Sequence, residues 1–332
     1  MKKSLKKSSR SHKDEHCPKD VYQDITDRII LALENGTIPW RKPWRVDGCS
    51  ATPMKLPCNA VTERSYNGVN VLLLWMTQLD LGFTSHRWLT FKQAKEAGGN
   101  VRKGESSTRI CCFRPFEKQV VDSNDEPVFD DDGNPQMRSL YRISAHQVFN
   151  VEQCEGLPES ILDLPESQPS TSHDELQQLD PLTLMRVQAM TQHSGVKVIH
   201  RAQTEAYYNP FPDVIALPET SQFLTEADYW STRLHELVHS TGHIKRLNRE
   251  GITSSQRRFG CPIYAFEELV AEIGSAFLCA DLKVIGEVQH ESYIDGWLTK
   301  LKEDKKAIFR AARQAREAVE YLLSCEQLEK AA

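Results

Sequence analysis

Leu234-His235-Glu236-Leu237-Val238-His239-Ser240-Thr241-Gly242-His243 is the stretch that decides the fold of the C-terminal half. His235 and His239 are four residues apart, so on an α-helix both project from one face and can bind one metal ion together. Glu236 would then lie beside the metal, where its carboxylate can take a proton from a water molecule that the metal activates. This pattern predicts a zinc hydrolase with Glu236 as its general base.

The flanking residues place the motif inside a helix. Thr225-Glu226-Ala227-Asp228 is typical of a capping box at a helix start, and Gly242 is typical of a helix end. Tyr229, Leu234 and Val238 give this helix an apolar face. Because a chance HExxH in a chain with 11 histidines is an event on the order of a few per cent, a third ligand is needed to support a metal site.

A second predicted helix, from Tyr264 to Leu278, supplies carboxylates. Glu268 and Glu272 are four residues apart on one face, where two like charges repel each other unless a cation lies between them. We expect Glu268 to be the third metal ligand and Glu272 to hold an N–H group of a ligand histidine. This spacing resembles the E-x-x-x-D helix of the gluzincin metallopeptidases.

Two other interpretations of this helix stay open. Glu267 could be the third ligand, or Glu267, Glu268 and Glu272 could form a solvated acidic face. The metzincin pattern is rejected, because it needs a histidine where Lys245 stands.

Two residues are candidates for stabilising an oxyanion. His243 is typical of a residue placed at a helix end by the helix dipole, and oxyanion stabilisation is its alternative role. Tyr264 is the second candidate for that role.

Composition and charge bound the class of protein. With 332 residues, of which 39% are apolar and 26% charged, the chain is typical of a soluble protein with two domains, each with a core of its own. It contains neither an apolar run near the length of a membrane span nor a hydrophobic signal core, so we expect a cytoplasmic protein without a membrane partner. Its nine cysteines lack a C-x-x-C pair, which favours free thiols over a disulfide framework.

The net charge of −5 hides an asymmetry. Residues 1–116 contain 20 Lys and Arg against 11 Asp and Glu, a balance of +9, whereas the remainder carries 21 against 35, a balance of −14. The N-terminal part is therefore expected to meet polyanions.

Composition shifts along the chain predict its domains. Residues 1–19 are lysine-rich and almost without apolar side chains, which indicates a disordered basic arm. We expect an α+β domain over 20–156, a linker rich in Pro, Ser and acidic residues over 157–181, and a second domain over 182–330. In the second domain, a helix at 182–193 and strands at 196–200, 206–208 and 213–217 lead into the HExxH helix, which is the arrangement of zincins. A long helical stretch, with Tyr293 on its apolar face, is expected over 290–323.

A segment of interleaved aromatic and basic residues is the candidate DNA-binding surface. Trp40 and Trp44 alternate with Arg41, Lys42 and Arg45 and are stiffened by prolines, as expected of a platform that stacks bases and contacts phosphates. The alternative is that the tryptophan rings anchor this loop to the core. Arg102 and Lys103, in a basic turn before a predicted strand at 108–113, are further candidates for contact with DNA. A second strand, which returns after an acidic turn-rich segment, is predicted at 141–151.

Both halves resemble one family. In the N-terminal half, the motifs Ile38-Pro39-Trp40-Arg41-Lys42-Pro43-Trp44, Tyr66-Asn67-Gly68-Val69-Asn70, Trp88-Leu89-Thr90-Phe91 and Val148-Phe149-Asn150-Val151 resemble the N-terminal domain of ArdC-type antirestriction proteins. The HExxH stretch and Glu267-Glu268-Leu269-Val270-Ala271-Glu272 resemble that family's C-terminal domain, which is like a metallopeptidase.

The resemblance implies a function and a cofactor. It implies a protein of a plasmid or mobile element, whose N-terminal domain binds single-stranded DNA and which shields incoming DNA from host restriction. It also implies a zincin-like fold with one divalent metal, Zn²⁺ or alternatively Mn²⁺, at His235, His239 and Glu268.

Two rival functions stay open beside this leading hypothesis. The chain could be a metalloprotease that processes a protein target, such as a host restriction component, with the basic half only recruiting it to DNA. It could also be a non-catalytic DNA-binding protein in which the metal only braces the fold.

Overall fold

The computed structural model describes residues 20–40, 55–123, 125–130, 132–162, 179–258, 260–284 and 293–326. The predicted basic arm, most of the predicted linker, and the candidates Arg41, Lys42, Trp44 and Arg45 lie outside these ranges. In the described part of the chain, no helix is both long and apolar enough to cross a membrane.

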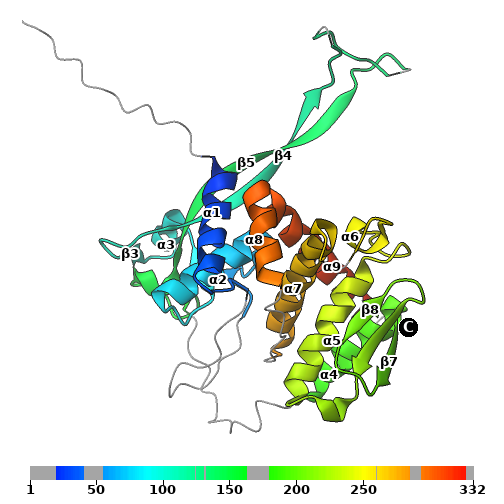
Figure 1. The fold of residues 1–332 in the computed structure, drawn as a ribbon. Helices are drawn as coiled ribbons and strands as arrows, with labels where there is room; N and C mark the ends of the chain where they lie inside the picture. Colours follow the sequence, from blue (N-terminus) through cyan, green and yellow to red (C-terminus); the bar gives the residue numbers. More distant parts are fainter. Residues whose placement is uncertain are drawn as a thin grey trace, which may run out of the picture.

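The N-terminal half combines three helices with a small sheet (Figure 1). The sheet order is β1-β2-β5-β4, and a separate antiparallel pair joins β3 to β6. The elements are α1 (Val21–Glu34), β1 (Cys58–Asn59), α2 (Val69–Leu81), β2 (Arg87–Leu89), α3 (Phe91–Glu96), β3 (Asn100–Val101), β4 (Thr108–Gln119), β5 (Met137–Asn150), η1 (Val151–Gln153) and β6 (Cys154–Glu155).

Strands β4 and β5 form a long antiparallel hairpin that projects from the body of the molecule (Figure 1). At its base, the side chain of Asn70 on α2 donates to the carbonyl of Cys111 at 2.7 Å and accepts from the Cys111 N–H at 2.8 Å. This amide takes the place of a neighbouring strand for one residue of β4, because it satisfies both backbone groups of an edge position.

The C-terminal half packs helices against a three-stranded sheet of order β7-β9-β8. β9 pairs parallel with β7 and antiparallel with β8, so β7 and β8 are the two edge strands of this sheet. The elements are α4 (Pro181–Ser194), β7 (Lys197–Arg201), β8 (Tyr207–Asn209), β9 (Val214–Pro218), η3 (Thr220–Gln222), α5 (Glu226–Thr241), α6 (Glu250–Thr253), α7 (Pro262–Leu282), α8 (Ile294–Glu303) and α9 (Ala307–Glu326).

The two halves share one hydrophobic cluster. The rings of Tyr22 on α1 and Phe309 on α9 meet edge to face with centroids 4.8 Å apart, and those of Trp75 on α2 and Phe277 on α7 at 5.7 Å. The expectation of a separate core for each domain is wrong for this cluster, because α1 and α2 bury apolar side chains against α7, α8 and α9.

The α+β fold class is confirmed, as are the predicted order of strands and the two metal-site helices. Two predictions about length were wrong. The stretch 290–323, predicted to be one long helical stretch, contains two helices, α8 and α9, which are separated by residues 304–306. The strands predicted at 108–113 and 141–151 extend to Gln119 and back to Met137, because the hairpin continues beyond the part that packs on the body.

Candidate metal centre

Helix α5 positions both candidate histidines. The Thr225 hydroxyl accepts a hydrogen bond from the Asp228 N–H at 3.0 Å and caps the helix start, and Gly242 ends the helix. The apolar face buries Leu234 and Val238, which fixes the rotation of the helix about its axis. His235 and His239 therefore turn inward together, and their Nε2 atoms lie 3.1 Å apart.

Glu268 on α7 completes a set of three ligand atoms. Its Oε2 lies 3.6 Å from Nε2 of His235, and its Oε1 lies 3.5 Å from Nε2 of His239. Ligand atoms about 2.0–2.1 Å from a tetrahedral zinc ion are about 3.3 Å from one another. The shortest contacts, 3.1 to 3.6 Å, are close to that value, and one ligand atom from each of the three side chains lies within 4.8 Å of the others, so the three side chains could hold a metal ion.

The burial of the three glutamates on α7 tests the interpretation that they form a solvated acidic face. Glu267 is 0% exposed and Glu268 and Glu272 are each 4% exposed. The alternative of a solvated acidic face is therefore wrong.

The electrostatics of this cluster favour a positive charge between its members. Burial alone would raise the pKa of Glu268, but His239 and His235 hold that pKa well below its ordinary range. Burial alone would lower the pKa of His239, but the charge of Glu268 and the bond to Glu267 raise it to about 10. Buried carboxylates that stabilise a cation at two imidazoles suit a divalent metal.

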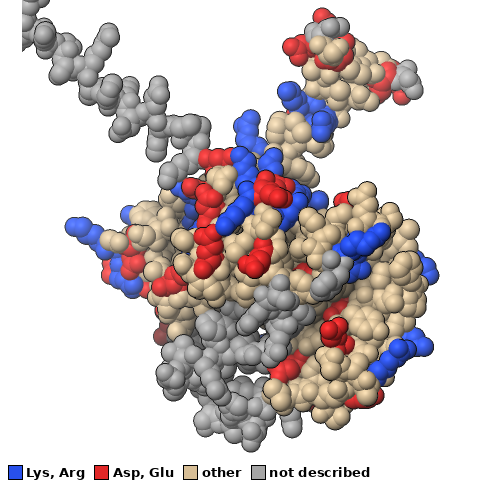
Figure 2. Space-filling model, viewed as in Figure 1, with Lys and Arg blue, Asp and Glu red and all other residues tan. Residues whose placement is uncertain are grey.

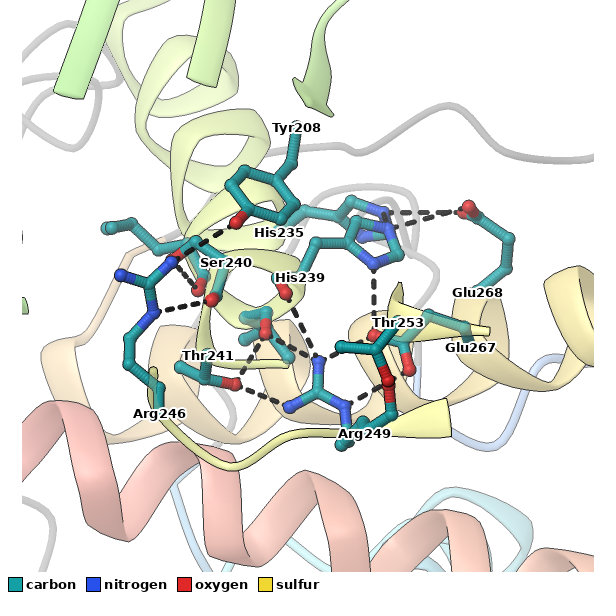
Figure 3. A network of polar contacts seen from close by, with 12 residues as sticks. Tyr208, His235, His239, Ser240, Thr241, Arg246, Arg249, Thr253, Glu267 and Glu268 are labelled. Carbon is teal, nitrogen blue, oxygen red and sulfur yellow. Dashed lines mark hydrogen bonds and ion pairs between the residues drawn. The ribbon is translucent and has the colours of Figure 1, made fainter. Parts of the chain in front are cut away.

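Glu267 contacts the Nδ1 side of the His239 ring, and Arg249 in turn binds Glu267 (Figure 3). Nδ1 of His239 lies 3.3 Å from Oε1 of Glu267, on the side of the ring away from Glu268. The buried guanidinium of Arg249 donates to both oxygens of Glu267, at 2.5 and 3.1 Å. It also donates to the Val238 carbonyl at 2.8 Å and to the Thr241 hydroxyl at 2.5 Å, so it ties the carboxylate to the end of α5.

The sequence pattern did not identify this support. It suggested Glu267 only as an alternative ligand, and it gave no indication of Arg249. The only sequence signal for this support was Glu267 itself, a carboxylate directly before the candidate ligand Glu268. Glu272, our candidate for the supporting role, is buried one turn beyond Glu268, and its bond to a ligand histidine stays a prediction.

Glu236, the predicted general base, is buried near the three candidate ligands. It is 4% exposed, and burial raises its pKa, although the nearby His239 and His235 oppose that change. A backbone hydrogen bond from Tyr208, on the edge strand β8, reaches the same carboxylate. Within the described residues its Oε2 is buried without a hydrogen-bond partner, so this oxygen is available to a water molecule or a substrate.

Two tyrosines lie near the ligand cluster. The Tyr264 hydroxyl lies 3.2 Å from the Tyr293 hydroxyl. Burial raises the pKa of Tyr264, and so does the charge of the neighbouring Glu268. The pKa of Tyr293 is raised too, first by burial and then by Glu268 and Glu236. Tyr264 was a predicted site residue, whereas the sequence pattern placed Tyr293 only on an apolar helix face.

His243 lies just beyond the end of α5. Its Nδ1 accepts a hydrogen bond from the Lys245 N–H at 3.2 Å and lies 3.9 Å from Oδ2 of Asp213. The ring thus has partners outside the ligand cluster, as expected of a residue at a helix end. A role for His243 in oxyanion stabilisation stays a prediction.

The structure places three of the candidate DNA-binding residues. Trp40 is 3% exposed, and its ring meets Trp297 edge to face at 5.6 Å, so it has no open face for a base. The prediction that Trp40 stacks bases is wrong for this conformation, and the alternative of a core anchor holds. Arg102 and Lys103 are exposed, and Arg102 pairs with Glu105 at 2.8 Å.

Two regions of the chain each match a different protein family. Residues 19–149 match the N-terminal domain of the anti-restriction factor ArdC. Residues 185–314 match a zincin-like metallopeptidase family.

Curated relatives include proteins of two kinds. An uncharacterised protein of Sinorhizobium fredii, y4eC, is 31% identical over 92% of both chains. Two DNA primases TraC of Escherichia coli are each 34% identical over 93% of this chain. The chain spans only 20% and 27% of the length of those primases.

Solved structures agree with the family matches. A metal-free structure of the antirestriction protein ArdC from plasmid R388 is 35% identical, with a TM-score of 0.71 over 92% of this chain and 98% of that one. Its Mn(II)-bound structure is 34% identical, with a TM-score of 0.69 over 93% and 99%. Since the likeness in sequence and fold runs through both halves, the chain belongs to the ArdC antirestriction family.

Proposed function

We propose that this protein is an antirestriction factor of a plasmid or mobile element that binds single-stranded DNA and carries a metal-dependent hydrolytic site. The observation that carries the proposal is the combination of a match to nearly the full length of ArdC with an intact set of three ligand atoms. It would act in the cytoplasm, on DNA that has just entered the cell. The match to the TraC primases covers too little of those proteins to extend primase activity to this chain.

The metal is held by His235, His239 and Glu268 in this proposal. Two imidazoles and one carboxylate accept either Zn²⁺ or Mn²⁺ according to supply. Zn²⁺ is our first choice, and the Mn(II)-bound structure of ArdC supports Mn²⁺ as the alternative.

The chain's own residues suit peptide hydrolysis. A bound divalent metal would supply Lewis-acid polarisation of a scissile carbonyl group. The unpartnered Oε2 of Glu236 would accept a proton from the attacking water, since the raised pKa makes this carboxylate a stronger base than an exposed glutamate. The Tyr264 hydroxyl, beside Glu268, would donate a hydrogen bond to the developing oxyanion. A host restriction component is the expected class of protein substrate.

A purely structural metal is the second candidate. It is favoured by the burial of the ligands, which are between 1% and 5% exposed, because a metal bound between two buried helices would contribute to the stability of the folded state. In that case the metal would only hold α5 against α7.

The test is the transfer of an unmodified plasmid into a restricting host that expresses the protein or a variant. We expect the natural protein to raise recovery of the plasmid, and His239→Ala to remove the effect because the metal is lost. Loss of protection by Glu236→Gln, with metal content unchanged, would support hydrolysis. Full protection by Glu236→Gln would support the structural metal, and no protection by the natural protein would overturn the proposed function.

A further inference from the structure

The outer part of the β4–β5 hairpin has no other element beside it. Strand β5 pairs with β2 only through Phe149 and Asn150, and the ring of Phe113 contacts Phe309 on α9 at 6.3 Å. Beyond Phe113, the two strands pair only with each other and project away from the body (Figure 1). A two-stranded ribbon of this kind is marginal as a stabilising element, so its length of 12 ladder pairs indicates another role.

One face of this ribbon gathers positive charge. Directly opposite residues of an antiparallel pair share a face, and faces alternate along each strand. The pairs Arg114 with Arg142 and Lys118 with Arg138 therefore lie on one face, with Phe116 opposite Leu140 between them. We call Arg114, Lys118, Arg138 and Arg142 the cationic face.

This arrangement places like charges opposite one another. Directly opposed like charges destabilise a β-ladder. Within the described residues, no carboxylate forms an ion pair with any of the four side chains, and Glu117 lies on the other face. The charges are thus left for a partner that is a polyanion.

The cationic face also offers surfaces for stacking. The guanidinium of Arg142 lies over the Phe116 ring, 5.5 Å from its centroid, and the ring itself is 38% exposed. Aromatic rings and guanidinium planes are the groups on which unpaired bases stack. The two pairs of cations are four residues apart along the strands, or about 13 Å, with the aromatic ring between them.

The tip of the hairpin has the opposite charge (Figure 2). Its carboxylates are held in tight turns: Oδ1 of Asp122 accepts from the Glu126 N–H at 3.0 Å, and Oδ1 of Asp130 accepts from the Asn134 N–H at 2.8 Å. An acidic tip repels phosphates, so it confines a nucleic acid to the stem.

We infer that the cationic face of the hairpin is a contact surface for single-stranded DNA, with phosphates on Arg114, Lys118, Arg138 and Arg142 and a base stacked on Phe116. The inference rests on the proposed function, since it locates the DNA contact within that function. A β-ribbon can also enter the major groove of a duplex, but a stacking ring between the cations favours unpaired bases.

The experiment is a salt titration of binding to labelled single-stranded and duplex oligonucleotides, using the full-length protein. One variant carries Arg114→Gln, Lys118→Gln, Arg138→Gln and Arg142→Gln. Because this variant lacks four cations that would neutralise phosphates, single-strand affinity should fall tenfold or more, and the slope of log K against log salt should become shallower by about 3. Phe116→Leu should weaken single-strand binding about fivefold or more and leave duplex binding unchanged.

A matched control removes the same charge elsewhere. Lys92, Lys302, Arg313 and Arg316 are cations that already pair with carboxylates, and the control changes all four to Gln. It should keep most of the affinity and slope of the natural protein. Thermal melting of both variants checks that the body remains folded.

The outcomes separate the inference from the proposed function. If the natural protein binds no DNA, both are overturned. If it binds single strands but the hairpin variant binds equally well, or the control loses as much, only the hairpin inference is wrong. A preference of the natural protein for duplex that depends on the cationic face would overturn the assignment to single strands.

Discussion

At the scale of single residues, a buried ion pair lies beside the candidate metal centre and includes none of its three candidate ligands. Glu267 lies between the Nδ1 side of His239 and the guanidinium of Arg249, and both charged side chains are less than 10% exposed. Burying such a pair costs about as much free energy as its attraction returns, so stability alone is a weak reason for it. Orientation of the imidazole is the stronger reason, because a carboxylate at Nδ1 fixes the ring and makes Nε2 a better ligand.

Replacing Glu267 should therefore weaken metal binding. We expect Glu267→Gln to lower the affinity for Zn²⁺ about 10- to 100-fold, because the neutral amide holds the ring without the charge. Competition with a chromophoric chelator measures the affinity, and a melting curve without metal checks the fold, since Arg249 loses its partner charge. Glu272→Gln is the matched comparison, as it removes another buried carboxylate from the same helix. A loss caused by Glu272→Gln and not by Glu267→Gln would return the supporting role to Glu272.

At the scale of elements, the close approach of α5 and α7 brings the ligands together. Gly274 lies in the interior of α7, and a Cβ atom added there would lie 2.8 Å from Cγ1 of Val238 and 3.1 Å from its Cγ2. Glycine in a helix interior costs about 1 kcal/mol relative to alanine. The helix accepts that cost because the missing side chain leaves room for Val238, one residue before His239.

Gly274→Ala should consequently destabilise the protein despite the better helix former. The gain of about 1 kcal/mol in helix propensity is opposed by overpacking of about 1–3 kcal/mol against a buried, stiff side chain. Adding Val238→Ala removes the clash, so the double variant should be more stable than the sum of the two single changes predicts, by about 1 kcal/mol. Urea unfolding of the four proteins measures this coupling energy. If the two changes in the free energy of unfolding are strictly additive, α5 and α7 move apart to admit the new methyl group at no cost in stability.

The sequence predicted the helices that carry the candidate ligands better than it predicted the residues and strands around them. Spacings of four residues on a helix, as in His235 to His239, have a physical meaning before any fold is known. Arg249 lies at the start of α6 and reaches Glu267 because the chain turns back there toward α5. No local sequence pattern predicts that turn. The hairpin length was missed for a related reason: exposed residues such as Phe116 on a projecting ribbon do not alternate with buried ones, so the usual signal of a strand is absent.

At the scale of the whole molecule, the shared cluster joins the N-terminal half to the half that contains the candidate metal centre. The Thr26 hydroxyl on α1 donates to the Lys305 carbonyl at 2.8 Å, and Lys302 on α8 pairs with Glu34 at 2.7 Å. Together with the contacts of Tyr22 and Trp75, these bonds cross the boundary that the sequence indicates between two domains. A fragment that ends at that boundary would expose the apolar faces of α1 and α2.

The two halves should therefore unfold together, in one transition that a metal in the C-terminal half shifts as a whole. Scanning calorimetry should give one peak, and saturating Zn²⁺ should move it upward, because a ligand that binds only the folded state stabilises everything that unfolds with its site. Hydrogen exchange locates the effect: amides of α2, in the N-terminal half, should gain protection with Zn²⁺ as amides of α7 do. Phe309→Ala should weaken this coupling, since the Phe309 ring contacts both Tyr22 on α1 and Phe113 on β4. Leu89→Ala is the control, because Leu89 lies in a separate cluster of the N-terminal half. This control should lower stability and leave the contacts between the halves intact. Two resolved peaks, with Zn²⁺ protecting only the amides of α7, would mean that the halves are independent despite their shared cluster.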